Sequence, residues 1–236
     1  MPRILHGQGE LLEKRGKALR TAQKHVRIYL KTLNLLDLVK FRFVGEPMQE
    51  PGVVIANHPS LLDFIALLLH YPKAVCLYKS QTLHNPVLAD FVQVGGYIEG
   101  MDGTRAASER IVSECCERLD EGHTVVIFPE GTRSKASGML RFRKTGFHAA
   151  IETGRAIQPV AIYCRPRFLG KGQPWLDFCK GRNYMVISYL PPISPDSIPE
   201  SVRNVGGLTQ AVRSAIQSEL VRLEKTDVAA IPSGRL

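Results

Sequence analysis

Two short polar blocks in this sequence hold the residue types that could do chemistry. Residues 57–63 read Asn-His-Pro-Ser-Leu-Leu-Asp, and residues 128–134 read Phe-Pro-Glu-Gly-Thr-Arg-Ser. A compact apolar run precedes each block, at residues 53–56 and 125–127. Short apolar runs of this kind are typical of buried strands. We therefore expect each block to lie where a buried strand ends, which is where α/β folds keep their functional residues.

His58 and Asp63 of the first block could form a base and its orienting carboxylate. If a helix begins at Ser60, Asp63 lies in its first turn and can accept a hydrogen bond from one imidazole nitrogen. The other nitrogen is then free to take a proton from a substrate hydroxyl. The alternative is structural, because Ser60 to Asp63 also matches the S-x-x-D capping box, whose carboxylate only satisfies backbone N–H groups. Taken by itself, the first block favours the cap.

The second block has the composition of a loop that binds an anion. Gly131 permits close approach of the backbone to a ligand. Thr132 and Ser134 offer hydroxyl groups, and Arg133 offers a planar guanidinium suited to phosphate. The alternative is a polar turn that follows a buried strand. The two blocks together are far more specific than either one alone.

Helical and strand-like patterns alternate along the chain around these blocks. They predict an α/β fold, with a mixed, largely parallel sheet flanked by helices and an N-terminal amphipathic helical segment. Pro159 lies within one expected strand and indicates an edge or irregular position there. The expected helices are 10–39, 60–70, 104–119, 145–153 and 207–224, and the expected strands are 41–44, 52–56, 74–78, 124–128, 156–163 and 184–190.

The expected N-terminal helix combines an apolar stripe with a strongly basic surface. Apolar residues recur at steps of three and four between Leu12 and Leu36, with either Tyr29 or Leu30 in the stripe. Such a helix, or a bent helical pair, could lie in a membrane interface. The alternative is an ordinary helix that packs on the core and exposes a basic back. The basic positions are Lys14, Arg15, Lys17, Arg20, Lys24, Arg27 and Lys31.

The composition limits the classes of protein that fit. With 236 residues and 44% hydrophobic content, the chain can bury a sizeable core. Its five cysteines are odd in number and form no C-x-x-C pattern, which predicts a reducing compartment. We expect neither a secretory signal in the polar residues 1–17 nor a membrane-spanning helix. The net charge of +9 predicts an anionic partner: nucleic acid, an acidic carrier protein, a phosphorylated small molecule or a membrane surface.

The two blocks resemble the first and third motifs of the glycerolipid and lysophospholipid acyltransferases, N-H-x-x-x-x-D and F-P-E-G-T-R-S. The resemblance runs from about Val53 to Ile162. It implies transfer of an acyl group from a thioester, acyl-CoA or acyl carrier protein, to a hydroxyl of a lipid-like acceptor, with no metal or other cofactor. It also implies that His58 is the general base and that Asp63 is its partner. The residues implied to bind an acceptor phosphate are Glu130, Gly131, Thr132 and Arg133.

Other parts of the chain match this family more loosely. Lys79 stands where the family often has a lysine, and Arg143 lies in a segment that resembles its basic stretch after the third motif. Residues 158–162 resemble the fourth motif. The chain departs from the second motif of the family, because Gly100 stands where the family has an arginine that binds phosphate. Arg105 is the alternative candidate for that role.

We therefore predict a lipid O-acyltransferase, with an acceptor such as a lysophospholipid, that is cytoplasmic and peripheral on the inner face of the membrane. Residues 1–40 form the expected membrane-associating segment, 41–226 the acyltransferase domain and 227–236 a polar tail. The alternatives are an acyl-thioester hydrolase, or a non-catalytic module that binds anionic lipid or nucleic acid. No nucleic-acid partner is expected, because the sequence has no recognised basic-aromatic motif.

Overall fold

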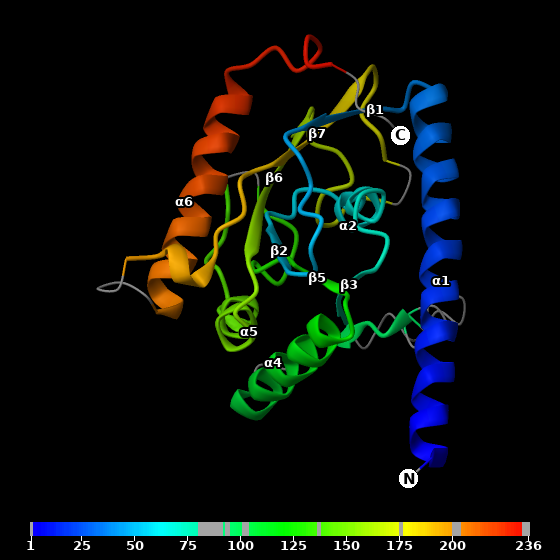
Figure 1. Cartoon of the computed structure of the whole chain (residues 1–236). Helices are drawn as coiled ribbons and strands as arrows, with labels where there is room; N and C mark the ends of the chain where they lie inside the picture. Colours follow the sequence, from blue (N-terminus) through cyan, green and yellow to red (C-terminus); the bar gives the residue numbers. More distant parts are fainter. Residues whose placement is uncertain are drawn as a thin grey trace.

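A seven-stranded sheet forms the centre of the computed structural model (Figure 1). The structure describes residues 2–79, 92, 95–100, 104–135, 138–174, 177–199 and 204–232. The strand order is β1-β7-β6-β2-β5-β3-β4, and every neighbouring pair is parallel except β6 and β7. This arrangement confirms the predicted mixed, largely parallel sheet. The strands are β1 (Val39–Val44), β2 (Val53–Ala56), β3 (Ala74–Tyr78), β4 (Ile98–Glu99), β5 (Thr124–Ile127), β6 (Ile157–Arg165) and β7 (Asn183–Tyr189).

Helices cover both faces of this sheet. On one face lie the long first helix and the short helix after β2, and on the other lie three helices that include the long helix after β7 (Figure 1). The last strand is followed by a short 3-10 turn, η2 (Pro195–Ser197). The α-helices are α1 (Pro2–Leu35), α2 (Asp63–Leu67), α4 (Arg105–Asp120), α5 (Thr145–Thr153) and α6 (Val205–Glu224).

Strands β2 and β5 are buried along their whole length, as their unbroken apolar runs predict. Because successive side chains along a strand point to opposite faces of the sheet, these two strands contribute residues to two separate cores. Val54 and Val126 belong to the core under α1 and α2. Val53 and Val125 belong to the core under α4, α5 and α6. The centre of the sheet is therefore held rigidly from both faces.

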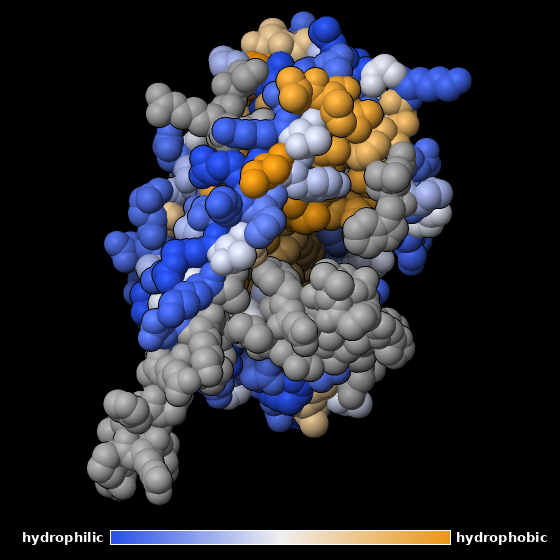
Figure 2. Space-filling view, turned by 90° about the vertical axis from the view of Figure 1, so that its right-hand side faces the viewer, coloured by the Kyte–Doolittle hydropathy of each residue, from blue (hydrophilic) through white to orange (hydrophobic). Residues whose placement is uncertain are grey.

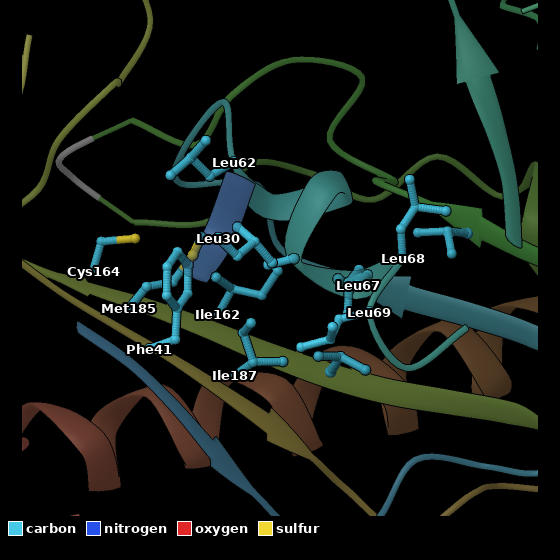
Figure 3. Packing of buried hydrophobic residues seen from close by; sticks show 14 of the residues in the cluster. Leu30, Phe41, Leu62, Leu67, Leu68, Leu69, Ile162, Cys164, Met185 and Ile187 are labelled. Atoms are coloured by element: carbon cyan, nitrogen blue, oxygen red, sulfur yellow. The ribbon is translucent and has the colours of Figure 1, made fainter. Parts of the chain in front are cut away.

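The core under α1 and α2 ties the first helix to the sheet. In Figure 3, Leu30 of α1 and Leu62, just before α2, lie over Ile162 of β6. Phe41 of β1 and Met185 of β7 complete this side of the core. Burying one such side chain contributes about 1.5–3 kcal/mol to the free energy of unfolding. The end of α1 is thus anchored on the sheet through β1, β6 and β7.

Pro159 does not mark an edge strand, because β6 lies between β2 and β7. The irregularity predicted from the proline is real, however. The regular ladder with β7 begins only at Val160, and beyond it the amide of Leu190 donates to the carbonyl of Pro159 at 3.0 Å. The side chain of Gln158 supports this interruption by donating to the carbonyls of Glu46 and Leu190. The lack of a backbone N–H at Pro159 is therefore tolerated inside the sheet.

The first helix is one continuous helix that packs on the core along much of its apolar stripe. Leu19, Leu30 and Leu33 are buried, so Leu30 rather than Tyr29 lies in the stripe. Leu36, which the pattern also places in the stripe, is 61% exposed, because the helix ends before it. Leu35 beside it is 84% exposed. Five of the predicted basic residues are confirmed as exposed, Lys17, Arg20, Lys24, Arg27 and Lys31.

The surface over α1 carries basic and apolar areas side by side. Figure 2 shows a hydrophobic area near the upper end of this face, beside a largely hydrophilic helix. The exposed apolar residues of this region include Ile28, Leu35 and Leu36. No helix in the described part of the chain is long and apolar enough to cross a membrane.

The segment that follows α6 packs on the sheet. Val228, in the segment predicted as a polar tail, is buried beside Val186 and Leu223. All five cysteines are free thiols, in agreement with the absence of a disulfide pattern in the sequence.

Candidate active site

The two polar blocks lie next to each other at one edge of the sheet. Strands β2 and β5 are parallel neighbours, with Ile55 opposite Ile127 in the register. The blocks follow these two strands directly, so both emerge at the carboxyl edge of the sheet. The backbone joins them as well, because the amide of Ser134 donates to the carbonyl of His58 at 2.7 Å. Each block therefore lies at the end of a buried strand, as predicted, and the structure adds that the two blocks are neighbours.

His58 and Asp63 form the hydrogen-bonded pair that their spacing predicts. The distance from His58 Nδ1 to Asp63 Oδ2 is 2.7 Å, and the aspartate is completely buried. The same oxygen accepts the amide N–H of Ser60 at 2.9 Å. One oxygen atom thus both orients the imidazole and satisfies a backbone N–H, although Ser60 is not the N-cap of the helix, which begins at Asp63 without a side-chain cap. The other oxygen, Oδ1, has no hydrogen-bond partner within the described residues.

The helix after the first block begins later than the pattern predicts. α2 begins at Asp63 rather than at Ser60, and it ends at Leu67. Residues 60–62 form a turn instead, in which the amide of Leu62 donates to the hydroxyl of Ser60 at 3.3 Å. This turn brings the carboxylate of Asp63 back to both the Ser60 amide and the His58 ring.

Burial controls the electrostatics of Asp63. Loss of solvent raises the pKa of this carboxyl above its usual 3.8, while the hydrogen bonds from His58 and Ser60 act to lower it. Because Asp63 accepts the hydrogen bond from Nδ1–H of His58, Nε2 is the nitrogen available to a substrate. The His58 side chain is 21% exposed, so a substrate can reach the ring.

Phe128 holds the other side of the imidazole. Its ring is stacked on that of His58, with the centroids 4.2 Å apart and the planes at 22°. The histidine is therefore oriented by a hydrogen bond at one ring edge and by an aromatic face. No local pattern in the sequence predicts this role of Phe128, because it depends on a contact between residues far apart in the chain.

Glu130 connects the two blocks from below the surface. Its Oε1 accepts the amide N–H of His58 at 3.2 Å and the hydroxyl of Ser134, and its Oε2 accepts the amide of Leu140 at 2.8 Å. The residue is 5% exposed. Its carboxylate therefore supports the loops internally. Direct contact of Glu130 with a substrate remains a prediction of the family resemblance.

Gly131 and Arg143 lie in contact at the outer face of the second block. Gly131 has a φ of 67°, and a Cβ built there would lie 2.9 Å from Cζ of Arg143. The amide of Arg143 also donates to the carbonyl of Pro129 at 2.8 Å. Glycine is needed here for its backbone conformation and for the close approach of the guanidinium. A basic group thus lies directly beside the exposed loop backbone.

Arg133 fastens a third loop to the site. Its Nη1 donates to the carbonyls of Leu169 and Gly170 at 2.9 and 2.8 Å. The Leu169 carbonyl also accepts the amide of Leu61 at 3.2 Å. The segment after β6 therefore closes one side of the site. Thr132, between Gly131 and Arg133, is half-buried.

Lys79 and Gly100 lie further along the same edge. Lys79 follows β3 directly and is exposed. Gly100 donates its amide to the carbonyl of Tyr78 at 2.7 Å, and a Cβ at Gly100 would lie 2.8 Å from that oxygen. An arginine therefore does not fit at this position without movement of the backbone. Arg105, the alternative cation, is highly exposed and pairs with Glu109 at 2.9 Å.

Asn57 extends the sheet at the base of the site. Its side chain donates to the carbonyl of Ile162 at 2.8 Å and accepts the amide of the same residue at 2.7 Å. It thereby continues the β2–β6 ladder with a side chain and fixes the start of the first block. Its position directly after a buried strand is the only signal in the sequence for this role. No group of three His, Cys, Asp or Glu side chains suited to a metal occurs in the described part of the chain.

Comparison with known proteins finds relatives that are named as lipid acyltransferases. The chain is 26% identical over 211 residues to a 1-acyl-sn-glycerol-3-phosphate acyltransferase of Chlamydomonas reinhardtii, covering 87% of this chain and 61% of the relative. It is 34% identical over 122 residues to the enzyme of that name from Neisseria gonorrhoeae. This match covers 50% of this chain and 48% of the relative. It is also 30% identical over 146 residues to the lyso-ornithine lipid O-acyltransferase of Pseudomonas aeruginosa. This match covers 61% of this chain and 55% of the relative.

The chain spans about half to three fifths of the length of these three curated relatives. A solved structure, the 1-acyl-sn-glycerophosphate acyltransferase PlsC of Thermotoga maritima, shares the fold with a TM-score of 0.71 and 23% sequence identity. That similarity covers 94% of this chain and 90% of the PlsC chain. Residues 39–163, more than half of the chain and including both polar blocks, match the family model described as Acyltransferase. The chain therefore belongs to the acyltransferase family.

Proposed function

We propose that this protein is an O-acyltransferase that moves an acyl group from an acyl thioester, acyl-CoA or acyl carrier protein, to a hydroxyl of a lipid-like acceptor. The observation that carries this proposal is the His58–Asp63 pair, with the second block fastened beside it. The pair supplies a base and its orienting group but no protein nucleophile, so the nucleophile comes from the substrate. The alcohol of the acceptor is that nucleophile.

The reaction follows from the hydrogen bond at Nδ1. Nε2 of His58 removes the proton of the acceptor hydroxyl as its oxygen attacks the thioester carbonyl carbon. Asp63 accepts the hydrogen bond from Nδ1–H and stabilises the imidazolium that forms. When the tetrahedral intermediate collapses, the C–S bond breaks and the imidazolium returns its proton to the departing thiolate. An ester and a free thiol are the products.

The loop from Glu130 to Arg133, with Lys79 and Arg143, is proposed to hold the head group of the acceptor. The contact between the Arg143 guanidinium and Gly131 supports this proposal, since it puts a cation beside exposed backbone. A lysophospholipid is the substrate class that this basic edge suits. Two relatives are named for a glycerol phosphate and for a lyso-ornithine lipid, so this family serves more than one head group.

The site is proposed to face the inner surface of the cytoplasmic membrane, with the protein bound peripherally. Strand β1 runs antiparallel to β2 in the sheet, so the chain leaves α1 and enters β1 at the same edge at which His58 emerges. The exposed side chains of Leu35 and Leu36 therefore lie toward the catalytic edge. Basic residues on α1 would add attraction to anionic lipid.

Measurement of thiol release with and without a lipid acceptor tests this function. Purified protein is given acyl-CoA or acyl carrier protein, and free thiol is followed in the presence and absence of a lysophospholipid. Acyl transfer predicts thiol release that requires the acceptor and matches the amount of acylated lipid formed. Release that is independent of any acceptor would instead identify a thioester hydrolase. Salt-sensitive nucleic-acid binding without thiol release would identify a binding module.

A further inference from the structure

A second cavity lies between α4 and α5, outside the site described above. Its volume is about 780 Å³, within the range of small-molecule sites in proteins. The two helices pack against each other (Figure 1), and the cavity follows their seam. Val112 and Cys116 contribute to its wall, and charged side chains surround them. The cavity is too large for a lone phosphate ion and has room for an elongated ligand.

The basic side chains of this cavity lie together at one of its ends. Arg105, Arg143 and Lys144 lie at the ends where α4 and α5 begin, and His148 lies one turn into α5. Glu109 lies near them and is paired with Arg105. Glu152 lies near the other end of α5, where it accepts a hydrogen bond from the thiol of Cys116 at 3.8 Å. A ligand that places an anionic group at the basic end matches this distribution.

Arg143 connects the cavity to the catalytic loops. It lines the cavity, its guanidinium touches Gly131, and its amide is bonded to Pro129. The helices α4 and α5 follow the parallel strands β4 and β5, so both helices begin at the carboxyl edge of the sheet, where His58 lies. The basic end of the cavity is therefore its catalytic end.

The cavity lies on the face of the sheet opposite α1. Residues of α4 and α5 belong to one core, and residues of α1 and α2 belong to the other. The exposed apolar end of α1 suits a membrane lipid, whereas charged side chains border the cavity between α4 and α5. Two substrates of different solubility can thus reach one catalytic edge from two sides.

We propose that the basic end of this cavity binds the phosphate of the pantetheine arm of the acyl donor, a chemistry that coenzyme A and a carrier protein's prosthetic group share. The proposal rests on the proposed function for the identity of the donor. The neutral amide-rich arm leaves the cavity at this basic end and extends toward His58, so the thioester reaches the catalytic edge. Lys144 and Arg105 are the proposed donor-binding residues, so Arg105 is assigned here to the donor and not to the acceptor phosphate.

Direct binding measurements test this assignment independently of catalysis. Coenzyme A is titrated calorimetrically into the wild-type protein, Lys144→Glu and Lys144→Arg. In a second arm, carrier protein with and without its phosphopantetheine group is titrated into the same three proteins. Lys144 is exposed and its side chain makes no capping hydrogen bond to α5, so the substitutions leave folding intact. Thermal unfolding verifies this.

We expect Lys144→Glu to weaken binding of coenzyme A, or of the phosphopantetheine-bearing carrier, by about tenfold or more, and Lys144→Arg to retain binding. The arm that responds identifies the source of the phosphate. Lys225→Glu, in a separate basic hollow with Arg165 and Arg182, is the matched control and leaves binding unchanged. Equal binding by wild type and Lys144→Glu in both arms overturns the proposal, as does an equal loss in Lys225→Glu. Acyl transfer that persists unchanged in Lys144→Glu leaves the proposed function standing while this donor site fails.

Discussion

The imidazole of His58 is stacked on the ring of Phe128, although the two residues lie on loops after different strands. Their ring centroids are 4.2 Å apart, and Asp63 holds the same imidazole through Nδ1 at 2.7 Å. Two contacts from two segments therefore determine the orientation of the base. Since proton transfer depends on geometry, a loss of either contact reduces turnover more than it reduces substrate binding.

Phe128→Leu removes the aromatic face while it keeps an apolar side chain. A stacked aromatic pair contributes about 0.5–1.5 kcal/mol, which corresponds to a roughly two- to tenfold loss in kcat. We expect KM for both substrates to change little. Steady-state kinetics with purified protein measure this. Phe178→Leu is the control, because Phe178 contacts Phe168 rather than the histidine, and an equal loss in both variants would contradict the orienting role of Phe128.

Asp63→Asn separates the orienting role of the aspartate from its capping role. The amide oxygen carries no charge to stabilise the imidazolium, so we expect kcat to fall by about 10²–10⁴. Loss of the cap alone would instead lower stability by about 1 kcal/mol, a shift of about 2–4 °C in the midpoint of thermal unfolding. Kinetics and thermal unfolding are measured on the same sample. A clear loss of stability with nearly normal kcat would show that Asp63 is only a cap.

The pH dependence of stability gives a second test of buried Asp63. Its pKa is raised in the folded state, so the folded protein holds this proton more tightly than the unfolded chain. Ionisation then costs stability as the pH rises above the unfolded value of 3.8 and up through the raised folded value. The asparagine of Asp63→Asn does not ionise, so the unfolding midpoint of this variant should rise relative to wild type over that interval. A difference that is constant with pH would contradict the raised pKa.

Gly131→Ala tests the contact between the second block and Arg143. The added Cβ requires a strained backbone at φ 67° and lies 2.9 Å from the guanidinium carbon. We expect a loss of about 1–3 kcal/mol in the free energy of unfolding, measured by urea denaturation. The double variant Gly131→Ala with Arg143→Ala should recover the steric part of this loss and retain the backbone part. Strict additivity of the two single variants would show that the two residues do not interact.

Leu35 and Leu36 provide the test of membrane contact. The double substitution of Leu35 and Leu36 by Glu should weaken binding to vesicles that contain anionic lipid by about tenfold or more. The reason is that apolar area is lost and negative charge is added. Co-sedimentation with vesicles measures the bound fraction. Val221→Glu, at a 42% exposed position on α6, is the control. If that control lowers binding as much as the change on α1, the end of α1 is not the contact surface.

Much of the fold is readable from local patterns. The strand Ala74–Tyr78 and the helix Thr145–Thr153 have the bounds that their sequences predict. The start of α4 is signalled by Thr104, whose side chain accepts the amide of Ala107. The sequence does not predict β4, because this strand of two residues exists only through its pairing with Leu77 and Tyr78.

The candidate site is predictable in its chemistry but not in its supporting contacts. The spacing of His58 and Asp63 is a local signal, since only a turn separates them. The internal role of Glu130 depends on loops that meet at the end of the sheet, so the same residue type fits either a ligand contact or a support. The late start of α2 has a similar cause, because the carboxylate of Asp63 is held by two groups outside the helix.

The most direct test of the central claim is the rate of lipid acylation by His58→Ala, measured by mass spectrometry of the acylated product from purified protein, acyl thioester and lysophospholipid. If His58 is the general base, kcat falls by about 10²–10⁴ with an unchanged midpoint of thermal unfolding. His25→Ala, an exposed position on α1, should acylate lipid at the wild-type rate. Acylation by His58→Ala at the wild-type rate would contradict the account, because His58 would then not be the base.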